Sequence, residues 1–132
     1  IKVEVLASNN YESPVLASQA VVVSPIEPTV VVYENNPLYG LMFHRETGDS
    51  HQIKDREVTF AAFPLFFSAL DRRDDNLKYS WSTNIGGVEN KNSVTYRSPD
   101  EASGSSVIQV SASSKSKIMQ NAKGSFLIQF GI

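Results

Sequence analysis

Short segments in which every second residue is apolar are the feature that most limits how this chain folds. In "LKYSWST" (77–83) large apolar residues alternate with small or charged ones. Successive side chains of a strand point to opposite faces, so this pattern is typical of a strand with one buried face. "TVVVYE" (29–34) is the strongest strand signal because it concentrates β-branched residues. About seven such segments follow residue 29, separated by turn signals at the spacing typical of antiparallel sandwiches.

No segment predicts a helix long enough to cover a parallel sheet. The segment "KSKIMQNAK" (115–123) matches a helical period only weakly and fits either a helical turn or a loop. Parallel strands need a crossover connection, which is usually a helix. The sequence therefore predicts an all-β fold, an antiparallel β-sandwich. A small barrel stays open as the alternative, because the number of strands alone does not separate the two.

The composition is that of a globular domain and excludes several classes of protein. Hydrophobic residues make up 41% and charged residues 20% of the 132 residues, which is enough for one ordinary core. The formal net charge is -2 and Lys and Arg are scattered, so we expect no nucleic-acid partner. The chain has no cysteine, which excludes disulfides and cysteine-ligated metals. No apolar run approaches the ~20 residues of a membrane helix, so we expect contact with a membrane only through an anchor outside this chain.

The prolines of "SPIEP" (24–28) divide the chain into two parts. Residues 1–24 predict a β-hairpin, with the turn formers of "SNNYES" between two extended runs. Residues 27–132 predict the sandwich. Proline holds its neighbours in extended geometry, as in a stiff linker. The hairpin is then either the end of a preceding repeat, which the prolines favour, or an addition to the edge of the same sandwich.

The only tryptophan predicts the centre of the core. Trp81 shares a strand face with Tyr79, so we expect both side chains between the two sheets. The segment "VTFAAFPLFFSA" (58–69) is dense in large apolar residues, which indicates burial on both sides. We therefore expect Phe60 and Phe63 in the core as well.

Oxygen-bearing side chains gather in the charged segment "DRRDDN" (71–76). Such ligands suit calcium, although the segment lacks the D-x-D-x-D-G spacing of the EF-hand, and Arg72 and Arg73 are placed to pair with the carboxylates. A calcium site is therefore an alternative to an exposed, ion-paired loop. Its candidate ligands are Asp71, Asp74, Asp75 and Asn76. A second group of residues matches no zinc spacing and predicts an exposed loop within residues 44–57; it comprises His44, Glu46, Asp49 and His51.

No catalytic constellation can be assembled from the sequence. Asp100 and Glu101 are adjacent on a turn after Pro99 and are expected to point apart. Serines are frequent, but none lies in a G-x-S-x-G motif. We therefore predict that the chain is not an enzyme and needs no cofactor.

The segment "YSWSTNIGG" (79–87) resembles the Y-x-W-x-x-x-x-G stretch of PKD-like and related immunoglobulin-like domains of bacterial and archaeal surface proteins. The order "YENNPLYG … FAAFPLFFS … LKYSWSTN … SSVIQVSAS … NAKGSFLIQF" is similar to repeat modules in surface proteins of uncultured small-genome bacteria. The resemblance covers about residues 28–132. It implies an immunoglobulin-like (PKD-like) antiparallel β-sandwich, on the outside of a bacterial cell.

Together these observations predict a non-catalytic extracellular module with a structural or adhesive role in a surface protein or filament. Its partners would be neighbouring repeats or subunits, or a protein or glycan ligand. Binding is expected at loops of one sandwich end, chiefly residues 44–57 and 71–76, or at an open sheet edge. The alternative is a carbohydrate-binding module, in which sugars stack on exposed aromatic rings; the candidate rings are Tyr11, Tyr33, Tyr39 and Tyr96.

Overall fold

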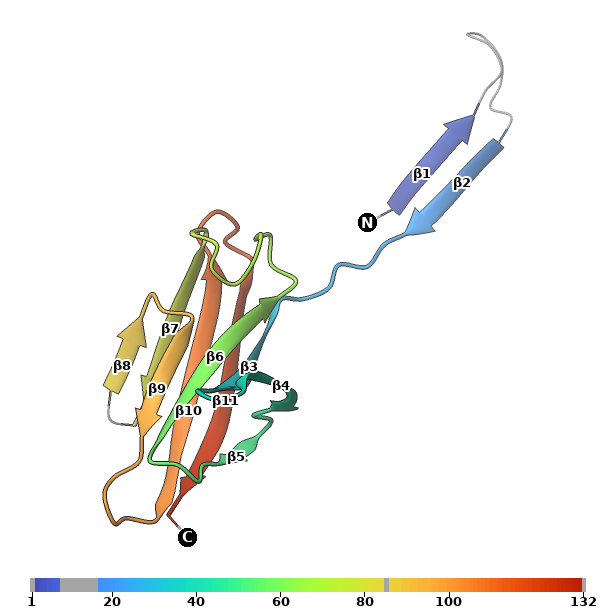
Figure 1. The fold of residues 1–132 in the computed structure, drawn as a ribbon. Helices are drawn as coiled ribbons and strands as arrows, with labels where there is room; N and C mark the ends of the chain where they lie inside the picture. Colours follow the sequence, from blue (N-terminus) through green and yellow to red (C-terminus); the bar gives the residue numbers. More distant parts are fainter. Residues whose placement is uncertain (1, 8–16, 85, 132) are drawn as a thin grey trace.

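The protein is all-β in a computed structural model, which describes residues 2–7, 17–84 and 86–131. Eleven strands account for the regular structure of these residues, and no helix is present among them (Figure 1). No described segment therefore forms a helix that could cross a membrane. The strands are β1 (Lys2–Ala7), β2 (Ala17–Val22), β3 (Thr29–Asn36), β4 (Gly40–Glu46), β5 (Ser50–Gln52), β6 (Glu57–Leu65), β7 (Leu77–Thr83), β8 (Gly86–Glu89), β9 (Ser93–Arg97), β10 (Gly104–Ser114) and β11 (Asn121–Phe130).

Two sheets pack face to face in a sandwich-like arrangement. One sheet has the order β4-β3-β6-β9, and the other has the order β5-β11-β10-β7-β8. Neighbouring strands are antiparallel except for β5, which pairs parallel to β11 along Ser50–Gln52. The described strands form separate sheets, each with its own edges, and not one closed barrel.

The core lies between the two sheets and follows the alternation of the sequence. Trp81 is 1% exposed at the middle of β7, and Phe60 of the opposite sheet is fully buried. Phe60 and Phe126 meet edge to face across the core, with ring centroids 5.0 Å apart, a favoured aromatic geometry. The buried cluster comprises Val32, Ile53, Val58, Phe60, Ala62, Leu77, Tyr79, Trp81, Tyr96, Ile108, Val110, Ala112, Phe126, Ile128 and Phe130.

Phe63 does not belong to this core. It is only half-buried, because Phe60 and Ala62 point inward and the pleat of β6 turns the next residue to the outer face. There Phe63 forms an aromatic cluster with Tyr33 and Phe43, with centroids 5.5 and 5.4 Å away. The expectation that both faces of β6 are buried was wrong at Phe63. It was based on the density of large apolar residues in this segment, whereas the two-residue period of a strand places Phe63 on the outer face.

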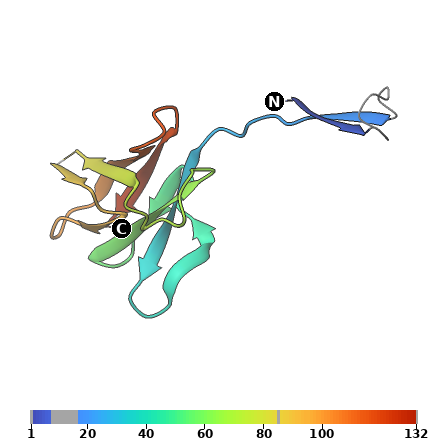
Figure 2. The same cartoon turned by 90° about the horizontal axis from the view of Figure 1, so that it is seen from above.

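The hairpin β1–β2 forms a two-stranded sheet of its own. All its described residues are exposed, and residues 23–28 connect it to β3 without regular structure. Both views show the hairpin standing clear of the sandwich (Figures 1 and 2). In this structure it does not add to the edge of either sheet.

Residues 44–57 do not form one long loop. Their first residues complete β4, Ser50–Gln52 form β5, and Glu57 opens β6. Residues 115–120, for which a helical turn was one expectation, form bends and turns before β11 begins.

Candidate functional site

The loops of the sandwich gather at two opposite ends, and β6 runs from one to the other. We call the end with residues 66–76 and 115–120 the upper end, and the end with residues 53–56 and 98–103 the lower end (Figure 1). Glu57 begins β6 at the lower end, and Leu65 leads into the upper end. The two segments predicted to act together, 44–57 and 71–76, therefore do not share one end.

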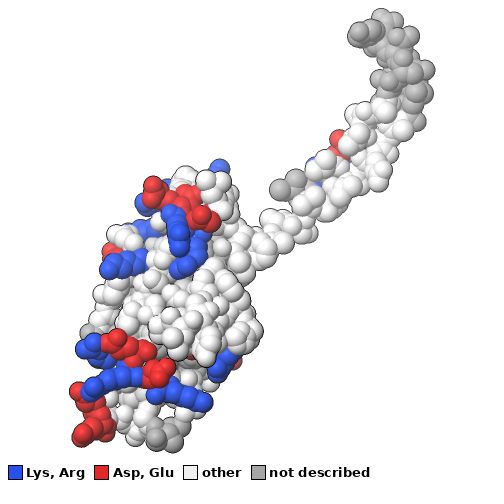
Figure 3. Space-filling model, viewed as in Figure 1, with Lys and Arg blue, Asp and Glu red and all other residues white. Residues whose placement is uncertain are grey.

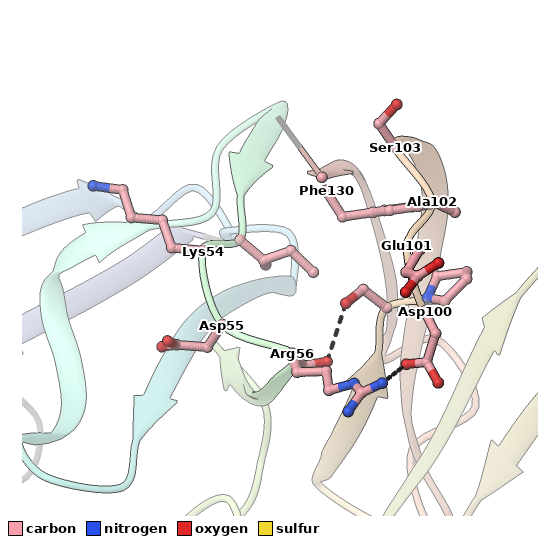
Figure 4. A pocket seen from close by; sticks show the side chains of 12 residues that line it. Lys54, Asp55, Arg56, Asp100, Glu101, Ala102, Ser103 and Phe130 are labelled. Atoms are coloured by element: carbon pink, nitrogen blue, oxygen red, sulfur yellow. Dashed lines mark hydrogen bonds and ion pairs between the residues drawn. The ribbon is translucent and has the colours of Figure 1, made fainter.

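An open hollow lies at the lower end, where the β5–β6 turn faces the β9–β10 loop (Figure 4). Its volume is about 610 Å³. Arg56 forms an ion pair with Asp100 across it, and the carbonyl oxygen of Arg56 accepts a hydrogen bond from the Ser98 backbone N–H at 2.9 Å. Phe130 lines it as well. The carboxylate of Asp100 is therefore committed to a partner on another loop.

Two residues at the lower end have a left-handed backbone conformation. Glu101 has a φ of 54°, a left-handed conformation that is costly for a residue with a Cβ. Gly131 has a φ of 66°, and a Cβ added there would lie 2.2 Å from the carbonyl oxygen of Ala102. Only glycine fits this approach. The chain directly after β11 thus lies close against the β9–β10 loop.

At the upper end, the Asp residues accept hydrogen bonds from nearby backbone N–H groups. Asp71 Oδ1 accepts from the N–H of Arg73 at 2.6 Å. The two carboxylate oxygens of Asp74 accept from Leu70 and Asn76, both at 2.8 Å. These bonds lower the pKa of Asp74, because they stabilise the charged carboxylate. Asp71 and Asp74 therefore shape the turn.

Asn76 joins the two loops of the upper end. Its Nδ2 donates to Ser114 Oγ at 3.1 Å, and its Oδ1 accepts from the N–H of Ser116 at 3.1 Å. Lys115 adds a further tie, from Nζ to the carbonyl oxygen of Asp75 at 2.6 Å. Asn76 thus has a structural role that the search for metal ligands did not foresee.

The sequence suggested that Arg72 pairs with the neighbouring carboxylates. In the structure its side chain contacts other groups. Its guanidinium lies over the Phe63 ring, 4.7 Å from the centroid, and donates to the carbonyl oxygens of Ala62 and Asn92 at 3.2 and 3.3 Å. Burial lowers the pKa of Arg72 from its usual value. The Tyr79 hydroxyl donates to the carbonyl oxygen of Arg72 at 2.7 Å, so the loop is anchored to the core.

The two groups of predicted metal ligands lie in different parts of the sandwich. Within residues 2–7, 17–84 and 86–131, no three His, Asp or Glu side chains converge to hold a metal ion. Of the second group, His44 is exposed on β4 whereas His51 is buried on β5. His51 is 7% exposed, and its Nε2 lies 2.9 Å from Glu34 Oε2.

The His51–Glu34 contact links the two sheets at the edge of the sandwich. Glu34 lies on β3 of one sheet and His51 on β5 of the other. The imidazole also meets Phe60 edge to face at 5.6 Å. The sequence carried a signal for this contact, because the alternation of β3 turns Glu34 to the buried face, where a carboxylate needs a partner.

The outer faces of the two sheets differ in chemistry. The β7–β10–β11 face carries a shallow groove of about 470 Å³, lined mainly by Ser80, Ser82, Gln109, Ser111, Lys123 and Ser125. The opposite face carries the cluster of Tyr33, Phe43 and Phe63. On the face seen in Figure 3, cationic and anionic residues lie side by side at both ends, and the middle is uncharged.

The four tyrosines considered for sugar stacking occupy different environments. Tyr39 is 77% exposed at the turn before β4, whereas Tyr96 is 6% exposed and packs in the core. Tyr33 is half-buried and meets Phe43 edge to face at 5.3 Å. Tyr11 lies outside the described residues. Among the described tyrosines, only Tyr39 therefore presents a ring largely to solvent.

Comparisons with known proteins identify no relative. No protein-family model matches the sequence. No match was found among the curated proteins or among the solved structures.

Proposed function

We propose that this chain is an immunoglobulin-like, non-catalytic module of a bacterial surface protein or filament, with a structural or adhesive role and no required cofactor. The observation that carries the proposal is the strand order. If β3, β6, β7, β8, β9, β10 and β11 are lettered A, B, C, C′, E, F and G, the sheets contain the orders A-B-E and G-F-C-C′. These neighbours agree with those of immunoglobulin-like sandwiches, in which strand C carries the buried tryptophan; β4 and β5 are additional edge strands beside β3 and β11. Trp81 lies on β7, which is strand C in this lettering.

The path of the chain supports a role as a spacer. The chain enters β3 at the upper end and leaves β11 at the lower end (Figure 1). Modules with this path can be joined end to end, and both terminal strands lie along the direction of tension. Pulling the ends would load the hydrogen bonds of these strands in shear, because ladder bonds are perpendicular to the strands. The proposed partners are neighbouring repeats or subunits, or a protein or glycan ligand.

Single-molecule force spectroscopy tests the spacer role. The chain has no cysteine, so handles can be attached through two introduced thiols. The end-to-end variant is Thr29→Cys with Gln129→Cys. The matched control is Thr29→Cys with Leu65→Cys, because these residues pair at one end of β3 and β6, where pulling opens the ladder bond by bond. We expect a higher rupture force for the end-to-end variant, and an equal or lower force would contradict the spacer role.

The carbohydrate-binding alternative rests on the exposed rings Tyr39 and Phe43, which are 77% and 59% exposed. Sugar rings stack on flat, accessible aromatic faces, whereas the cluster around Phe43 presents ring edges to its neighbours. Binding to a glycan array that is lost in Tyr39→Ala and kept in Tyr96→Phe would favour this alternative. Absence of glycan binding together with the higher end-to-end rupture force would favour the spacer.

A further inference from the structure

The N-terminal hairpin can be aligned with the C-terminal hairpin of the sandwich. Both are antiparallel pairs, and each residue of β1 and β2 has a counterpart 105 positions later in β10 or β11 with the same pairing partner, as from Val3 to Ile108. The pairs in β1–β2 are Val3↔Val21, Val5↔Gln19 and Ala7↔Ala17, and the corresponding pairs in β10–β11 are Ile108↔Phe126, Val110↔Gly124 and Ala112↔Ala122.

The correspondence extends to the residue types. Among the twelve residues of β1 and β2, three are identical to their counterparts: Val5 and Val110, Ala7 and Ala112, Ala17 and Ala122. No gap is needed, because the pair Ala7↔Ala17 spans the same number of residues as the pair Ala112↔Ala122. Pairing register decides which residues of a hairpin share a face, so at this offset the apolar faces of the two hairpins coincide.

The difference between the hairpins is what covers their apolar faces. Ile108, Val110, Ala112 and Phe126 are buried between the sheets. Their counterparts on β1–β2 face solvent: Val3, Val5 and Val21 are 49%, 64% and 52% exposed. They line a hollow of about 510 Å³ along one face of the hairpin. A lone two-stranded hairpin is at best marginally stable, so this face needs a covering layer.

We infer that β1–β2 is the last hairpin of a preceding module of the same design, and that the rest of that module covers its apolar face. The inference deepens the proposed function and rests on it, since it defines a series of modules with a period of 105 residues. The occupant is a sheet equivalent to β4-β3-β6-β9, together with a strand equivalent to β7. Val110 pairs with Trp81, 29 residues earlier. A large core residue is therefore expected 29 positions before Val5, and an upstream coding sequence without strand alternation around that position would overturn the inference.

A tandem chain tests whether the hairpin fits that place. Residues 29–105 are joined directly to Ile1 of the complete chain, so that β1 and β2 occupy the positions that β10 and β11 occupy in the sandwich. The measurement is amide hydrogen exchange of β1 and β2 in the tandem chain and in the 132-residue chain. We expect exchange at least about a hundredfold slower in the tandem chain, because buried sheet amides open only with their module.

Two adjacent substitutions give a matched control in the tandem chain. Val5 and Leu6 are similarly exposed here, at 64% and 61%, but they point to opposite faces of β1. Val5→Asp should abolish the protection, whereas Leu6→Asp, at the position of the outer-face residue Ser111, should keep it. An equal effect of both would contradict the inference.

A second tandem variant allows for the smaller side chains of the hairpin. Val3→Ile and Val21→Phe introduce the residues found at positions 108 and 126. Protection in either tandem chain supports the inference, and absence of protection in both overturns it. A concentration-dependent dimer of the 132-residue chain that Val5→Asp dissociates would also overturn it, in favour of a second copy as the occupant. The force measurement on the sandwich is independent of these results, so failure of this inference can be told apart from failure of the proposed spacer role.

Discussion

At the residue scale, the interior depends on two aromatic side chains whose polar atoms are both satisfied. Trp81 Nε1 donates to the carbonyl oxygen of Lys91 at 2.8 Å, and the Tyr79 hydroxyl donates to that of Arg72 at 2.7 Å. Each bond ties a buried strand to a loop. Buried donors without partners would be costly, so these contacts fix the loops as well as the rings.

Trp81 should therefore fluoresce as a buried indole. We expect blue-shifted emission that acrylamide quenches weakly and that glycans do not change, because the side chain is 1% exposed. Trp81→Phe should lower the free energy of unfolding by about 2 kcal/mol, from the lost hydrogen bond and the cavity left behind. Emission resembling that of free indole would contradict the buried position.

Tyr79 should make stability depend on pH in the alkaline range. Burial raises the pKa of Tyr79 to about 12, whereas the unfolded side chain ionises near pH 10. The unfolded state loses this proton first, so the contribution is present below pH 10 and is lost as the pH rises from about 10 to 12.

The variant Tyr79→Phe isolates that contribution. This substitution should lower the free energy of unfolding by about 1 kcal/mol at neutral pH, because the hydrogen bond to Arg72 is lost. Between pH 10 and 12 the free energy of unfolding of the variant should fall less than that of the parent protein. Urea unfolding at several pH values measures both effects. The exposed control Tyr39→Phe should follow the parent profile, and an identical profile for Tyr79→Phe would refute the assignment.

The inward positions of Trp81, Tyr79 and Phe60 follow from alternation, which is why the sequence was sufficient to predict them. Phe63 was misplaced because a dense apolar segment was taken as buried on both sides, although the period from Phe60 turns it outward. The cover that Arg72 provides for Phe63 depends on the path of a loop, which side-chain periodicity does not encode.

At the scale of elements, the sheet edges hold the features that the sequence concealed. The short strand β5 has no apolar period, and its pairing with β11 depends on backbone groups. The N–H of Leu127 donates to the carbonyl oxygen of Asp49, and the N–H of Ile53 donates to the carbonyl oxygen of Gln129, both at 2.9 Å. Backbone pairing leaves no compositional signal. The partner of His51 could have been sought among inward-facing polar residues, where Glu34 is a candidate.

The His51–Glu34 contact should help to hold β5 in place. His51→Ala and Glu34→Ala should each lower the free energy of unfolding by about 1–3 kcal/mol, because each leaves a largely buried partner without its hydrogen bond. A double-mutant cycle should give a coupling of about 1 kcal/mol, with faster exchange of the Leu127 amide. The exposed control Glu46→Ala should change neither the free energy of unfolding nor the exchange of the Leu127 amide. A coupling of zero between His51 and Glu34 would rule out that their contact holds β5.

The loop of residues 71–76 should not respond to calcium. Asp71 and Asp74 already accept backbone N–H groups, and Asn76 is committed to the neighbouring loop. We expect the same melting temperature in millimolar calcium and in a chelator. An increase of several degrees that Asp74→Asn and Asp75→Asn abolish would establish a calcium site instead.

At the scale of the whole molecule, the sandwich should fold without the hairpin. Removal of residues 1–24 should leave a cooperative transition with a melting temperature within about 1 °C of the full chain, since the hairpin forms its own sheet. Removal of residues 1–31 should be strongly destabilising, because Val30 packs against the core. A large change on the shorter deletion would show that the hairpin supports the sandwich.

The all-β class was predictable from the sequence because alternation and turn signals extend along the chain. Which strands are neighbours was not, because strand order depends on how connections cross between sheets. The correspondence between the two hairpins was readable, since the offset of 105 residues needs no gap. It was missed because the alternation and turn formers of the N-terminal hairpin were considered by themselves, without comparison with the C-terminal strands.

The two sheets are joined across the core by packing and by rings such as Phe60 and Phe126, where antibody domains use a covalent bridge between sulfur atoms. Nothing in that interior changes with the redox potential of its surroundings. The sandwich should therefore reach the same structure under reducing and oxidising conditions, and a cell could produce it without any enzyme that forms disulfides.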